Sequence, residues 1–198
     1  MRKSTRAEAM LLGPLLAAFG RNAEAHIVAG QATGFISGVL HPISGVDHIL
    51  AMVSVGVWGA QLGAPAIWIL PVTFPIMMAF GGLLGFLGVS LPGGEIGIAL
   101  SMVVLGGAVM LEARPPLYLV VAIVAFFAIF HGYAHGTELP QGESALLYSL
   151  GFVLATGFLH LVGITAGLIH RWGWGMKALR IAGTGVSLAG MFFLWSAA

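Results

Sequence analysis

The sequence predicts an all-α polytopic membrane protein: a bundle of six transmembrane helices that follow an N-terminal signal-like segment. Of its 198 residues, 59% are hydrophobic and only 8% are charged. The mean hydropathy of +1.00 lies outside the range of soluble domains. The 30 glycines suit helices that approach closely in a membrane. The alternating strands of about ten residues that build a membrane β-barrel are not seen.

Residues 1–25 are predicted to be a signal peptide. A basic start and a short apolar stretch precede Ala23-Glu24-Ala25, which fits a cleavage site. We therefore expect residues 26–198 to form a single transmembrane domain. The alternative is a retained N-terminal helix that is too short to span.

Six apolar segments follow, each close to the roughly 20 residues that a bilayer requires. In the first of them, Pro42 and Gly45 predict a broken helix near His41-Pro42, because proline removes a backbone donor and clashes with the preceding turn. The six predicted spans are 33–60, 65–89, 96–111, 116–135, 144–170 and 177–195.

The basic residues predict the orientation of the bundle. Beyond the leader, Arg114 lies between the third and fourth spans, and Arg171, Lys177 and Arg180 lie around the connection between the last two. Because cytoplasmic loops of membrane proteins are rich in Lys and Arg, we expect these connections inside the cell. Both mature termini are then outside a bacterial cytoplasmic membrane.

Two polar clusters interrupt the apolar segments. In "FHGYAHGTE", His131, His135 and Glu138 follow an i, i+4, i+7 pattern and share one helix face. In "HPISGVDH", His41 and His48 are seven residues apart, and Asp47 can turn inward if the helix breaks. Ionisable side chains are costly inside a membrane unless they are paired or line a cavity, so both clusters are functional candidates.

Two further histidines are candidates with an open alternative. His160 lies in the middle of the fifth span, either as a metal ligand or as a helix–helix hydrogen-bonding residue. If cleavage follows Ala25, the α-amine and imidazole of His26 could chelate a metal. Otherwise His26 is a polar residue that precedes the first span.

The residue types indicate a transition-metal site. Imidazole and carboxylate without thiolate, in a chain that has no cysteine, suit divalent Ni, Zn, Co or Fe(II). We expect the two clusters to meet around one divalent cation and to pass it inward. No nucleotide motif is present, so the sequence predicts that transport does not depend on ATP. No His-Glu-x-x-His zinc helix is present either, so we do not expect an enzyme, and no nucleic-acid partner is expected.

The clusters also carry a family resemblance. "HPISGVDHILAMVSVGVW" and "FHGYAHGTE" resemble the two signatures of the HupE/UreJ family, and "GFVLATGFLHLVG" in the fifth span is similar too. The resemblance implies a permease for Ni²⁺, or Co²⁺, associated with nickel enzymes. It carries over the metal positions His41, Asp47, His48, His131, His135 and Glu138.

Other interpretations use the same histidines. An intramembrane metal-dependent enzyme could activate water with them, and His48 with His135 could hold a haem iron. The small residues Gly30, Gly34 and Gly38 could pack within the bundle or between subunits of a homo-oligomer.

Overall fold

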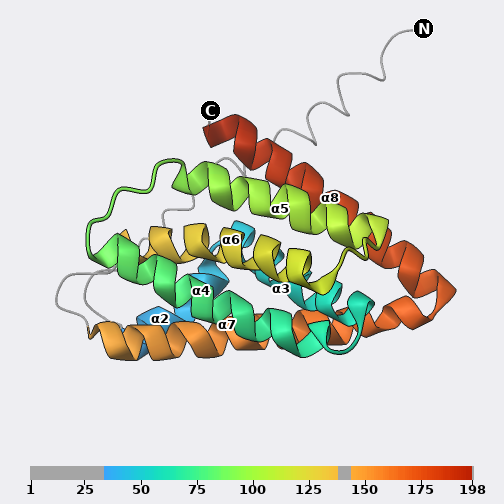
Figure 1. Cartoon of the computed structure of the whole chain (residues 1–198), viewed down its shortest axis with the longest axis horizontal. Coiled ribbons are helices and arrows are strands. Elements are labelled where there is room, and N and C mark those ends of the chain that lie inside the picture. The colour runs from blue at the N-terminus through green and yellow to red at the C-terminus, as the bar shows by residue number, and fades with distance from the viewer. Residues whose placement is uncertain (1–33, 138–143, 198) are drawn as a thin grey trace, which may run out of the picture.

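The computed structural model describes residues 34–137 and 144–197, and this part of the chain is a bundle of helices (Figure 1). The predicted signal peptide at 1–25, His26 and Glu138 lie outside the described residues. The helices are α2 (Gly34–Ser44), α3 (Val46–Leu62), α4 (Ala66–Phe86), α5 (Gly94–Leu111), α6 (Leu117–Thr137), α7 (Ala145–Gly167), the short 3₁₀ helix η1 (Leu168–Arg171) and α8 (Gly173–Ala197).

The predicted membrane spans are confirmed within this part of the chain. Helices α4 to α8 give five segments that are long and apolar enough to cross a bilayer. Helices α2 and α3 form one pair, bent by 80°, that gives a sixth segment if it is taken as a single span. The helix bounds agree with the predicted spans to within a few residues. The largest difference is at the last helix, which begins at Gly173 rather than at residue 177.

The break in the first span lies at Gly45, three residues beyond Pro42. Pro42 is still inside α2, whereas Gly45 is extended, with φ −93° and ψ 119°. The Ser44 hydroxyl donates to the His41 carbonyl at 2.8 Å, which satisfies an acceptor at the helix end. Asp47 lies in the first turn of α3, where the helix dipole favours a negative charge.

Glycines bring the helix pairs into backbone contact. In the α4–α6 pair, a Cβ atom added at Gly132 would overlap the Met78 carbonyl, and one added at Gly81 would overlap the Ile129 carbonyl. Gly38 packs in the same way against the Tyr148 backbone of α7. At that position the small-residue pattern therefore serves packing within the bundle. The other close approaches are Gly56 and Gly163 between α3 and α7, Gly151 between α7 and α2, and Gly106, Gly183 and Gly190 between α5 and α8.

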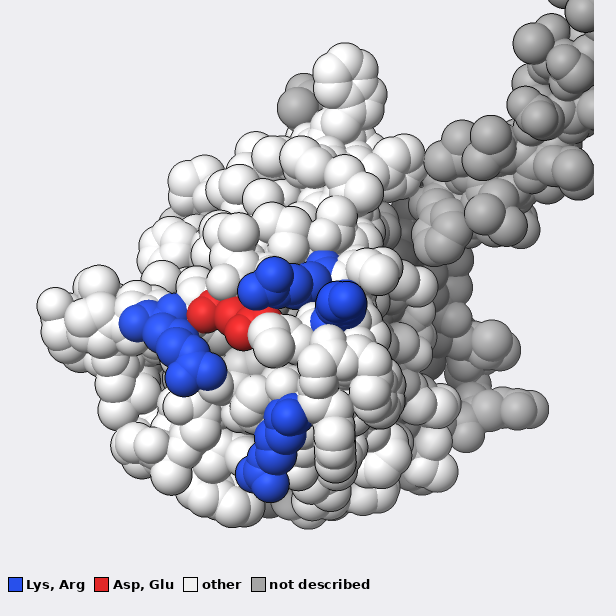
Figure 2. Space-filling view, turned by 90° about the vertical axis from the view of Figure 1, so that its right-hand side faces the viewer, with Lys and Arg blue, Asp and Glu red and all other residues white. Residues whose placement is uncertain are grey.

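Positive charge gathers at one end of the bundle, which we call the basic end. The connections α3–α4, α5–α6 and α7–α8 meet there, and Figure 2 shows the Lys and Arg side chains on this face. Exposed aromatic rings lie in the first turns of helices that begin here, as at Trp68, Tyr118 and Trp174, as expected at a membrane interface. All four Lys and Arg among the described residues lie at this end: Arg114, Arg171, Lys177 and Arg180.

Candidate metal centre

Four histidines from three helices form one group, which we call the histidine cluster. It consists of His41 on α2, His48 on α3, and His131 and His135 on α6. The ring centroid of His48 lies 4.9 Å from that of His131 and 4.5 Å from that of His135. The two sequence motifs, far apart along the chain, therefore meet in space. They meet at the end of the bundle opposite the basic end, where α6 stops and α7 starts.

A hydrogen bond joins the two motifs directly. His135 Nδ1 and His41 Nε2 are 2.7 Å apart, and both side chains are buried. His135 Nε2 is also buried and makes no hydrogen bond. When His135 Nδ1 donates to His41 Nε2, a lone pair remains on His135 Nε2.

Asp47 fixes the state of His48 rather than reaching across to α6. Its Oδ1 atom accepts a hydrogen bond from the His48 backbone N–H at 2.9 Å and lies 2.9 Å from His48 Nδ1. Because an ionised carboxylate only accepts, Nδ1 carries the proton and Nε2 keeps its lone pair. His48 Nε2 is buried without a hydrogen-bond partner. A carboxylate behind an imidazole in this way orients the ring and raises its basicity as a metal ligand.

Ser101 on α5 orients the His131 ring as Asp47 orients that of His48. The Ser101 hydroxyl donates to the Ile98 carbonyl at 2.6 Å, so its oxygen is left to accept from His131 Nε2 at 2.9 Å. His131 Nδ1 then carries a lone pair, and it is buried without a partner. Ser101 was not among the predicted site residues. A serine inside an apolar segment was its only signal in the sequence.

In these tautomers the cluster presents three buried imidazole nitrogens with lone pairs: His48 Nε2, His131 Nδ1 and His135 Nε2. An ion about 2.1 Å from three such nitrogens would hold the ring centres about 4.5–5.2 Å apart. The His48 ring lies at about this distance from the rings of His131 and His135. The three nitrogens do not point at one common position. Within the described residues, no group of three His, Asp or Glu side chains is arranged to hold a metal. Binding therefore requires the rings to rotate.

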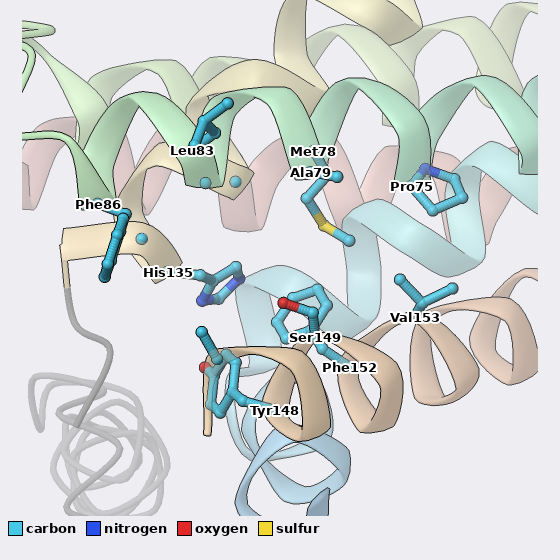
Figure 3. A pocket seen from close by; sticks show the side chains of 14 residues that line it. Pro75, Met78, Ala79, Leu83, Phe86, His135, Tyr148, Ser149, Phe152 and Val153 are labelled. Carbon is cyan, nitrogen blue, oxygen red and sulfur yellow. The ribbon is translucent and has the colours of Figure 1, made fainter. Parts of the chain in front are cut away.

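A cavity of about 390 Å³ provides room beside His135. It lies between α4 and α7, and α6 contributes Gly132, His135 and Gly136 to its wall. Figure 3 shows His135 among Met78, Tyr148 and Phe152, and the His135 and Phe152 ring centroids are 4.4 Å apart. His135 is the only member of the cluster in this wall, so it is the ring with most freedom to turn.

His160 is not part of the histidine cluster. No ring contact joins His160 to a histidine of the cluster within the described residues; instead the Phe74 ring neighbours both, with its centroid 5.6 Å from that of His131 and 5.3 Å from that of His160. Phe74 is fully buried, and nothing in the sequence singled it out among the apolar residues of its helix. His26 and Glu138 remain predictions, since they lie outside the described residues.

Comparison with known proteins agrees with the two motifs. The family model of the HupE / UreJ protein matches residues 14–193. The chain is also 43% identical over 180 residues to Protein HupE of Rhizobium leguminosarum bv. viciae, an alignment that covers 90% of this chain and 94% of that protein. No solved structure matches the chain. Two histidine motifs that meet inside a helical bundle with five or six candidate membrane spans, together with these matches, show that the chain belongs to the HupE/UreJ family.

Proposed function

We propose that this protein is a secondary permease that imports Ni²⁺, or Co²⁺, across the bacterial cytoplasmic membrane without ATP and supplies the metal to nickel enzymes. Members of the HupE/UreJ family are generally nickel or cobalt transporters rather than enzymes. The observation that carries the proposal is the set of three buried imidazole nitrogens in the histidine cluster, on His48, His131 and His135, that make no hydrogen bond. Polar atoms left unsatisfied at membrane depth are costly, and a bound cation would satisfy all three.

The cluster divides into ligands and residues that orient them. His48, His131 and His135 supply nitrogens to the ion. Asp47 holds the His48 ring through Nδ1, and Ser101 holds the His131 ring through Nε2. His41 orients His135 in the same way. Imidazole ligands suit borderline divalent metals, and the preference for nickel or cobalt within that class comes from the family.

Further donors complete the proposed site from the sequence. Glu138 directly follows α6 in the chain and belongs to the second motif, so we keep it as a predicted ligand. His26 remains a predicted ligand of the mature N-terminus. Neither is needed for the three-nitrogen arrangement described above.

The basic end indicates which way the ion moves. Because loops rich in Lys and Arg remain in the cytoplasm, the end that carries Arg114, Arg171, Lys177 and Arg180 faces inward. The histidine cluster then lies in the outer half of the membrane, and the ends of α8 and α6 face outward. This arrangement fits capture of a metal ion from outside.

The membrane potential can drive uptake without a second energy source. A potential of about 100 mV, negative inside, contributes about 4.6 kcal/mol to moving a divalent cation inward. That is equivalent to a concentration ratio of roughly three orders of magnitude.

The spacing of the histidines argues against a haem between His48 and His135. Two axial imidazoles bind opposite faces of the iron, so with Fe–N distances of about 2 Å their ring centres would be more than about 6 Å apart. The observed separation of 4.5 Å leaves no room for a porphyrin. An intramembrane enzyme with the same ligands would retain its metal and show no ion flux, which the following experiment distinguishes.

The experiment compares two acid-to-amide substitutions in whole cells. Asp47→Asn removes the carboxylate that holds His48, and we expect Ni²⁺ accumulation at limiting metal to fall about 10- to 100-fold, the usual cost of losing such a partner. Glu112→Gln is the matched control, because Glu112 pairs with Arg180 at the basic end, 3.2 Å away and far from the cluster. Membrane levels of both variants are measured by immunoblot. Normal uptake by the Asp47 variant at normal protein levels would remove Asp47 from the mechanism.

A further inference from the structure

A second set of buried polar groups lies beyond the histidine cluster on α7. Thr156 and His160 are one helical turn apart on the same face, with 0% and 1% of their surface exposed. Thr156 Oγ1 and both ring nitrogens of His160 make no hydrogen bond of good geometry. Each unsatisfied buried polar group costs about 1–3 kcal/mol. Retaining two of them on one face of a transmembrane helix points to a function.

The carbonyl of Pro71 on α4 lies close to the His160 imidazole. In a helix this carbonyl would accept from the N–H of residue 75, but that residue is Pro75, which has no N–H. The His160 imidazole approaches the Pro71 carbonyl without reaching hydrogen-bond geometry. An imidazole nitrogen and a carbonyl oxygen thus lie close together, with the Thr156 hydroxyl one helical turn away on α7. Carbonyls freed in interrupted helices are common cation ligands in transporters.

Phe74 separates this group from the histidine cluster. Its fully buried ring lies near the rings of both His131 and His160. His160 is eight residues further along α7 than Phe152, which lies beside His135, and this corresponds to about 12 Å along the helix axis. A cation that leaves the cluster toward the basic end therefore meets Phe74 and then His160.

We propose that His160, Thr156 and the Pro71 carbonyl form a second, inner binding station for the same divalent transition-metal ion, on the cytoplasmic side of Phe74. This inference rests on the proposed transport function. One imidazole with two neutral oxygens is a weaker ligand set than the three imidazoles of the cluster. Weak binding suits a station on the exit path, because an ion must leave each site for transport to proceed.

The test measures Ni²⁺ binding to the purified protein by equilibrium dialysis with ⁶³Ni, together with the kinetics of uptake in cells. Thr156→Val removes the hydroxyl with little change in shape, and His160→Phe removes the imidazole nitrogens. Thr165→Val is the matched control on the same helix, since the Thr165 hydroxyl donates to its own helix at Val162 and its side chain is exposed. If His160→Phe fails to fold, Thr156→Val still tests the proposal.

We expect wild type to bind a tight and a weak equivalent of Ni²⁺, and both inner variants to lose only the weak one. Their maximal uptake rate should fall about tenfold while the external Ni²⁺ concentration for half-maximal uptake stays unchanged, because capture occurs at the cluster. If wild type transports Ni²⁺ but binds only one equivalent of it, or if the inner variants behave like Thr165→Val, the proposal of an inner binding station is wrong. The proposed outer site at the histidine cluster is not affected by that result. If wild type neither binds nor accumulates Ni²⁺, the proposed function itself fails.

Discussion

The packing of α4 against α6 predicts that Gly132→Ala damages both the fold and the metal site. Gly132 lies between His131 and His135 on α6, and a Cβ atom there would overlap the backbone of Met78. Backbone atoms of a packed helix cannot rotate away as a side chain does. The methyl group must therefore push α4 and α6 apart at the level of the cluster.

The magnitude follows from two opposing effects. Inserting a methyl group into a tight contact costs about 1–3 kcal/mol, and a backbone neighbour places this site at the upper end of that range. Alanine returns up to about 1 kcal/mol through its higher helix propensity. The net loss is about 2 kcal/mol, which lowers the ratio of folded to unfolded protein by a factor of about 30.

The assay is reversible unfolding of the purified protein in mixed detergent micelles, with Gly157→Ala as the control. Gly157 also lies in the middle of a membrane span, on α7, but a Cβ atom there meets nothing within 4 Å. We expect Gly132→Ala to lose about 2 kcal/mol and Gly157→Ala to match or exceed wild type. Equal stability of the two variants would refute the close contact between α4 and α6.

Three further predictions test other parts of the structure. Ser101→Ala removes the acceptor for His131 Nε2, so the Ni²⁺ concentration for half-maximal uptake should rise about tenfold; an unchanged value would mean that Ser101 does not orient the ligand. Because the chain has no cysteine, single introduced cysteines report its orientation in the membrane. In intact cells an impermeant maleimide should label Ser90→Cys, whereas Gly173→Cys at the basic end should react only after permeabilisation. The reverse pattern would show that the bundle has the opposite orientation. Arg180→Ala breaks an ion pair whose arginine is 55% exposed, so it should change the unfolding free energy by less than about 0.5 kcal/mol, and a larger loss would show that this pair stabilises the α5–α8 contact.

The spans could be predicted because bilayer thickness sets their length and hydropathy depends on local sequence alone. The meeting of the two histidine motifs could also be anticipated, since polar groups at membrane depth need partners and each motif offered some to the other. The break in the first span was also predicted, near His41-Pro42, and it lies at Gly45. Pro42 costs one hydrogen bond near the end of α2, where few remain to lose, whereas Gly45 adopts the extended backbone that ends the helix.

The supporting residues of the site lay beyond sequence reasoning for a different reason. Ser101 and Phe74 acquire their roles only through the packing of α4, α5 and α6 around His131. A lone serine or phenylalanine in an apolar segment has no periodic signal that marks it. Asp47 was recognised as part of the motif, but an ideal helix places it off the face of His48. Its contact with the His48 ring depends on being in the first turn of α3, directly after the break.

The most direct test is the anomalous scattering of nickel in a crystal of the protein grown with Ni²⁺. We predict one strong peak within about 2.1 Å of His48 Nε2, His131 Nδ1 and His135 Nε2, with Asp47 and Ser101 still bonded to the far nitrogens of their histidines. A strong peak elsewhere in the protein, with these three imidazoles unliganded, would contradict the shared site on which the transport proposal depends.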